Sequence, residues 1–155
     1  MYGEALAWLE ASSLGVAARS AGQAYAIVNT LHVLGAALVV GAIAVFDVLV
    51  LVRRGPEAVG AARVAIPLAA AGLALQVATG AVLLAADARA TGTNPAFLAK
   101  LGFIALGIVN LAVLHARFGP GWRGAFPAVA ARPFAAVSLA AWVLALAAGR
   151  MIAYV

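Results

Sequence analysis

The chain has 155 residues, of which 66% are hydrophobic and only 10% are charged. Soluble domains carry about 45–50% apolar and about 25% charged residues, so this composition excludes an ordinary soluble protein and predicts one helical membrane domain. The net charge of +5 comes from basic residues beside apolar segments, a pattern that favours contact with lipid headgroups over binding of nucleic acid. The chain contains no cysteine, which excludes disulfides and thiolate metal sites.

Residues 1–21 are too polar to span a bilayer and are predicted to form a short amphipathic helix at the membrane interface. Leu6 and Trp8 would face the lipid, whereas Glu10 and Arg19 would face water. A frayed terminus is the alternative interpretation. The acidic start, without a basic region before an apolar core, disfavours a cleavable signal peptide.

Four apolar runs follow within residues 22–155, and each is long enough to cross a bilayer. Backbone polar groups in lipid must be satisfied within their own segment. The sequence therefore predicts an all-α integral membrane protein, a four-helix up-down bundle. Gly35 and Gly41 are candidates for close helix contact. The predicted spans are residues 24–52, 64–87, 95–116 and 134–155.

The distribution of arginine predicts the orientation. Two of the three predicted connectors are rich in arginine, and the positive-inside rule places them in the cytoplasm and both termini outside. The opposite side carries two arginines, offset by acidic residues. The basic connectors contain Arg53, Arg54 and Arg63, and Arg117, Arg123 and Arg132; the opposite side contains Arg19, Arg89, Glu4, Glu10 and Asp87.

Three ionisable residues, His32, Lys100 and Arg150, lie within apolar runs of three different spans. Because the first and third spans run in the same direction and the fourth returns, the three residues are predicted to share one depth on the outer side. Such residues are candidates for a functional site. The alternatives are that Lys100 and Arg150 extend to the headgroups, and that His32 forms a structural hydrogen bond, for example to Asn29.

A second, inner layer is predicted at Asp47 and His115. Asp47 follows His32 by fifteen residues on the first span, and His115 follows Lys100 by fifteen residues on the third. This spacing corresponds to about 22 Å of rise and a net turn of about 60°, so each pair falls on broadly the same helix face. In the alternative interpretation, Asp47 pairs with the arginines that close its span, and His115 is an interfacial residue. The polar residues predicted between the two layers are Gln76 and Asn110.

The same arithmetic excludes a haem held between the two histidines of one chain. His32 and His115 are separated by roughly 20 Å along the membrane normal. A haem would use one histidine, with Lys100, another weak ligand or none on its other side. No metal site is predicted, because neither histidine has a second histidine or a carboxylate at ligand spacing on its own helix.

Four stretches that together cover nearly the whole chain resemble a family of small bacterial four-helix membrane proteins of unknown function: WLEASSLGVAARS, TLHVLGAALVVGAIAVFDVLVL, NPAFLAKLGFIALGIVNLAVLH and GRMIAYV. This resemblance implies a multi-pass protein of the bacterial inner membrane. The early histidine and the early lysine of the first and third spans are also distantly similar to copper-resistance D-type proteins and to the J-type protoporphyrinogen oxidase. That similarity implies haem b ligated by His32, with Lys100 and Arg150 near propionates or an acidic substrate.

Three functions follow from these observations, and whether the protein is an enzyme stays open. The first is a redox-linked or haem-b-binding membrane protein that uses His32, Lys100 and Arg150. The second is a carrier for a small anion or a metal, working as an oligomer, with Asp47 and His115 as an inner relay. The third is a non-enzymatic accessory or assembly subunit. The expected partners are the lipid bilayer and further copies of the chain or a larger membrane complex.

Overall fold

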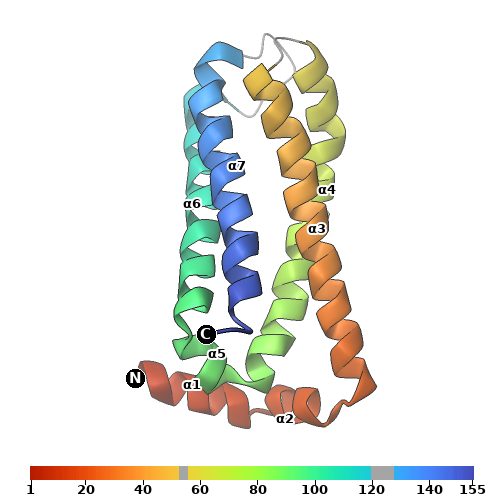
Figure 1. Ribbon diagram of the computed structural model, residues 1–155, viewed down its shortest axis with the longest axis vertical. Helices are drawn as coiled ribbons and strands as arrows, with labels where there is room; N and C mark the ends of the chain where they lie inside the picture. Colours follow the sequence, from red (N-terminus) through yellow and green to blue (C-terminus); the bar gives the residue numbers. More distant parts are fainter. Residues whose placement is uncertain (53–55, 120–127) are drawn as a thin grey trace.

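A computed structural model describes residues 1–52, 56–119 and 128–155, and within these ranges it contains helices and no strands. The predicted all-α fold is confirmed. Four long helices run alternately up and down side by side, and each is long and apolar enough to cross a membrane (Figure 1). They are α3 (Gln23–Val52), α4 (Pro56–Ala86), α6 (Pro95–Phe118) and α7 (Ala128–Met151).

Two of the predicted spans are longer than the hydropathy pattern indicated. Helix α4 begins at Pro56 and α7 begins at Ala128, whereas the predicted spans began at residues 64 and 134. Proline suits the first position of a helix, and the acidic Glu57 follows it in the first turn of α4. Alanine-rich sequence then continues each helix beyond its apolar run. The remaining connector residues, 53–55 and 120–127, lie outside the described residues.

Both termini lie at one end of the bundle, here called the termini end, and the opposite end is the connector end (Figure 1). Helices α1 (Tyr2–Ala11), α2 (Ser13–Ser20) and α5 (Ala88–Thr93) lie across the termini end. The N-terminal segment is thus helical, as predicted, but it forms two helices instead of one. Ser12 divides the segment because its backbone is extended and its hydroxyl oxygen accepts a hydrogen bond from Gly15 N at 3.2 Å, which caps α2.

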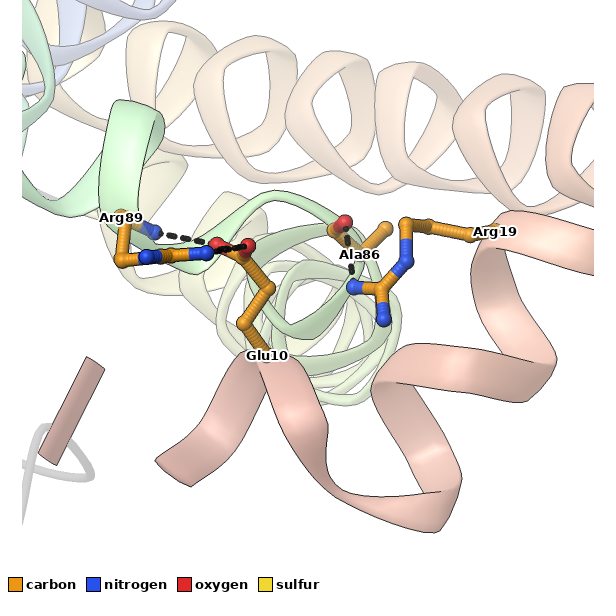
Figure 2. A network of polar contacts seen from close by, with 4 residues as sticks. All are labelled: Glu10, Arg19, Ala86 and Arg89. Carbon is orange, nitrogen blue, oxygen red and sulfur yellow. Dashed lines mark hydrogen bonds and ion pairs between the residues drawn. The ribbon is translucent and has the colours of Figure 1, made fainter. Parts of the chain in front are cut away.

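Polar contacts attach these short helices to the bundle (Figure 2). The Glu10 carboxylate accepts hydrogen bonds from the backbone N–H of Arg89 at 2.8 Å and from its guanidinium at 3.1 Å. Arg19 donates to the carbonyl oxygen of Ala86 at the end of α4, at 3.1 Å. The backbone and side-chain hydrogen bonds from Arg89 lower the pKa of Glu10 below its ordinary value. The N-terminal helices are thus fixed to the α4–α5 corner.

The four long helices form an open ring. The backbone of α3 lies close to those of α4 and α7, and α7 lies close to α6, whereas α6 does not approach α4 or α3 closely over the described lengths. Burial agrees with this order, because 28% of the most apolar stretch is buried in α3 and in α7 but only 17% in α4 and in α6. At the connector end, side chains of all four helices still meet in one apolar cluster, at Val50, Ala58, Leu114, Ala131 and Ala135. The line along which α4 and α6 face each other without close backbone contact is here called the seam.

Glycine sets the close approach of α3 and α4. A Cβ atom added at Gly72 would lie 2.9 Å from the carbonyl oxygen of Gly35 and 2.9 Å from Val39 N. Gly35 thus has the predicted role in close packing, since only glycine lets the two backbones come so near. Gly41 does not, because a Cβ there would meet nothing within 4 Å.

Candidate functional site

Two of the three predicted outer-layer residues meet near the termini end. Lys100 Nζ lies 3.3 Å from His32 Nε2, and Nδ1 of the same imidazole lies 2.9 Å from the hydroxyl oxygen of Thr79. We call His32, Thr79 and Lys100 the histidine cluster. Its members come from α3, α4 and α6, so the cluster bridges the seam that separates α4 from α6.

The partners of Thr79 assign the protonation of the imidazole. The Thr79 hydroxyl donates its single hydrogen to the carbonyl oxygen of Leu75 at 2.6 Å. The hydroxyl oxygen must then accept from His32, so Nδ1 carries the proton. This leaves Nε2 as an acceptor, to which the Lys100 amino group donates. The geometry thus assigns a neutral His32, protonated on Nδ1, that accepts a hydrogen bond from Lys100.

Close contacts from three further residues shape the cluster. A Cβ at Gly80 would lie 3.0 Å from His32 Cε1, so α4 leaves the space that the imidazole ring fills. Gln76, on the same face of α4, donates from its side-chain amide to the backbone carbonyl of His32. On the far side, a Cβ at Gly149 of α7 would lie 3.4 Å from Lys100 Cδ. All four spanning helices therefore contribute to this region.

The Arg150 side chain points away from the histidine cluster. Its guanidinium donates to the Tyr154 hydroxyl at 2.5 Å and lies 4.9 Å from the centre of that ring, and the side chain is exposed. Its neighbour Gly149 does lie against Lys100, so the backbone of Arg150 is at the predicted level. The contacts of Arg150 fit a cation that extends to the headgroups.

Both predicted inner-layer residues line one cavity near the connector end. The cavity has a volume of about 210 Å³ and is bounded by all four spanning helices. Asp47 is buried, with 2% of its surface exposed, and His115 is half-buried. The lining is otherwise mainly apolar, and the polar residues in it are Asp47, Asn110, His115, Ser138 and the indole of Trp142.

The polar groups of the cavity differ in whether they have hydrogen-bond partners. The Asn110 amide donates to the carbonyl oxygen of Phe134 at 3.0 Å, and His115 Nδ1 lies 2.9 Å from the carbonyl oxygen of Leu111. Ser138 supplies a hydrogen-bond donor to the Asp47 carboxyl group. The second carboxyl oxygen, Oδ2, is buried and has no hydrogen-bond partner among the described residues.

Sequence reasoning missed Thr79 and Ser138, which complete the two polar groups. The two residues expected between the layers instead belong to one group each, Gln76 to the histidine cluster and Asn110 to the cavity. A signal for Thr79 was present, because it lies one helical turn after Gln76 and so shares its face. Ser138 had no comparable signal in the sequence.

The hydrogen bonds of His32 bear on the haem hypothesis. The Nδ1–H of His32 donates to Thr79, so iron would have to be bound by Nε2, and Nε2 instead accepts from Lys100. The residues in this arrangement do not fit a haem, and the haem hypothesis would require Lys100 to leave Nε2. No group of three histidine, aspartate or glutamate side chains that could hold a metal ion occurs within residues 1–52, 56–119 and 128–155.

Comparison of the chain with family models, curated proteins and solved structures finds no match. The resemblance to small bacterial membrane proteins therefore stays a prediction.

Proposed function

We propose that this protein is a small membrane carrier that moves protons through the interior of its bundle, both alone and together with a small solute. The observation that carries the proposal is the hydrogen-bonded series Lys100–His32–Thr79, which joins three spanning helices. Ionisable residues within spanning segments are costly, and they are commonly found in proton relays and along the paths of ions and substrates.

The chemistry of the histidine cluster suits proton transfer. Lys100 and His32 both exchange protons, and their nitrogens are 3.3 Å apart, so a proton can move between them along an existing hydrogen bond. Two positive charges at this distance in a poorly screened interior would repel each other strongly. The pair is therefore expected to hold one transferable proton, with Thr79 fixing the orientation of the imidazole.

The second polar group supports a carrier over a structural protein. The cavity beside Asp47 is on the connector-end side of the bundle, whereas the histidine cluster is near the termini end. The same two helices, α3 and α6, supply ionisable residues to both groups. A path with polar groups at two depths is typical of carriers, whose solute sites lie within the membrane. Four spans are few for one carrier, which favours a homo-oligomer.

Proton movement through reconstituted protein tests the proposal. Liposomes with an internal pH-sensitive dye would receive an acid pulse outside, with potassium and valinomycin to balance charge. We expect faster acidification than in protein-free liposomes, and we expect His32→Ala and Lys100→Met to reduce it to the protein-free rate. Arg150→Gln is the matched control, because this cation bonds Tyr154 and is expected to leave the rate unchanged. Equal rates for all variants would contradict the proposal.

The proposed location is the bacterial inner membrane, with the connector end in the cytoplasm and both termini outside. The excess of arginine in the connectors supports this orientation. A reporter that is active only outside the membrane, fused to the C-terminus, should therefore be active, and a cytoplasmic reporter there should be inactive. The reverse result would invert the orientation, although the two polar groups would keep their places in the bundle.

A further inference from the structure

We propose that the cavity near the connector end binds a lipophilic amine, with the ammonium group on Asp47 and the apolar body in the seam between α4 and α6. This inference rests on the proposed carrier function for the role of the ligand as the solute. The binding site itself is argued from its own geometry, and it uses none of the residues of the histidine cluster.

The size of the cavity fits one ring with a short substituent. Its volume is about 210 Å³. An apolar protein cavity of about 150 Å³ is known to bind benzene. The additional space accommodates a short chain that carries one polar group. The mainly apolar lining, with few polar groups that converge on one side, is typical of small-molecule sites.

Asp47 Oδ2 requires a donor that the described residues do not supply. The residue is 2% exposed, its Oδ2 atom has no hydrogen-bond partner in the described part of the chain, and Asp47 lines the cavity. A buried carboxylate oxygen without a donor is unfavourable, because it has lost its hydration without a replacement. A ligand with an N–H group would remove this cost.

The charge of the site favours an amine over an anion. Asp47 and His115 are the ionisable residues among those that line the cavity. His115 Nδ1 lies against the Leu111 carbonyl oxygen, so the proton there is directed at the backbone of its own helix. An anion would be repelled by Asp47, whereas an ammonium would form a charge-assisted hydrogen bond with it, which is the stronger class of such bonds.

Access to the cavity is from the bilayer. The backbones of α4 and α6 do not approach each other closely, although both helices line the cavity. Ile66 of α4 and Ile108 and Leu111 of α6 line the cavity and are also exposed on the apolar outer surface. We therefore infer that a ligand enters sideways, between these residues. A ligand that partitions into hydrocarbon would reach Asp47 without crossing a polar surface.

Benzylamine is a suitable probe, with benzyl alcohol and ethylbenzene as ligands of similar shape and no charge. Binding to the full chain in detergent micelles would be measured by equilibrium dialysis against protein-free micelles. We expect saturable binding, with the affinity highest for benzylamine, lower for benzyl alcohol and lowest for ethylbenzene. Asp47→Asn should weaken benzylamine binding at least about tenfold, the effect of losing one charge-assisted hydrogen bond, and leave ethylbenzene binding unchanged.

Two further variants control this experiment. Asp87→Asn removes an exposed carboxylate outside the cavity and should bind all three ligands as the wild type does. Ala69→Leu adds volume to the cavity wall and should weaken binding of all three. Unchanged ethylbenzene binding by Asp47→Asn shows that this variant is folded.

Three outcomes would overturn the inference. They are benzylamine binding that does not saturate, binding that Asp47→Asn leaves unchanged, and displacement of all three ligands alike by phospholipid, which would assign the cavity to an acyl chain. The carrier proposal is tested separately, because dialysis in detergent does not depend on transport. If no amine binding is found but proton flux depends on His32, only the amine site is rejected. If amine binding is found but no His32-dependent proton flux, only the carrier function is rejected.

Discussion

The side-chain nitrogen of Lys100 lies 3.3 Å from Nε2 of His32, although the backbones of α6 and α3, which carry these residues, do not approach each other closely. The long lysine side chain reaches His32 across the interior of the bundle. Because His32 in turn contacts Thr79 of α4, a polar connection links α6 to α4 near the termini end, whereas near the connector end a mainly apolar cavity lies between these helices.

The tautomer of His32 is the first test of this arrangement. We expect ¹⁵N NMR of the protein in detergent at neutral pH to show a proton on Nδ1 and none on Nε2, because Thr79 accepts from Nδ1. Thr79→Val should abolish this preference and destabilise the bundle by about 0.6 kcal/mol, the mean for such hydrogen bonds in membranes. Thr30→Val is the control, since Thr30 bonds only its own helix at Ala26 O. A wild-type imidazole protonated on Nε2 would refute the assignment.

The contact between α3 and α4 should depend on Gly72. A methyl group there would lie 2.9 Å from backbone atoms of α3, so Gly72→Ala must push the helices apart. We expect the free energy of unfolding, measured by titration with sodium dodecyl sulfate, to fall by about 1–3 kcal/mol. Gly41→Ala has open space around it and should instead stabilise α3 by about 0.5–1 kcal/mol through helix propensity. Equal effects of the two substitutions would contradict the close packing.

Acid should release the N-terminal helices. Hydrogen bonds from Arg89 lower the pKa of Glu10 in the folded protein. A group of this kind contributes stability above its unfolded pKa, and the contribution is lost as the pH falls through the lower, folded value. We expect the NMR chemical shift of the Arg89 amide proton to change with pH, with a midpoint below 4.5, the ordinary pKa of the Glu10 carboxyl group. In Glu10→Gln this transition should be absent. A midpoint above 4.5 would show that the pair does not form.

A visible spectrum separates the carrier from a haem protein. The nitrogen of His32 that could bind iron, Nε2, accepts a hydrogen bond from Lys100, so we expect protein expressed with added haem to be colourless after purification in detergent, with and without dithionite. Lys100→Met exposes Nε2 and is the variant in which haem ligation by His32 is most favoured. A Soret band in the wild type that His32→Ala abolishes would reject the role proposed here for the histidine cluster.

The sequence by itself determined the class of protein, the number of spans and the depth of the ionisable residues. These properties depend on the apolar content of each run and on a constant rise per residue, both of which are local. Asp47 and His115, which the fifteen-residue offset predicted in one layer, line the same cavity. Helix starts were less accurate, because alanine-rich turns extend a helix beyond the apolar run that hydropathy detects.

Only the tertiary structure decided which polar groups meet. His32 and Lys100 lie 68 residues apart, and their contact, like the hydrogen bond of Thr79, depends on which helices pack and which leave a seam. Arg150 was predicted at the same depth, but it turns to Tyr154 because a long exposed cation gains more at the headgroups than in the interior. The cavity and the buried Asp47 Oδ2 likewise depend on how all four helices pack together, which no local pattern encodes.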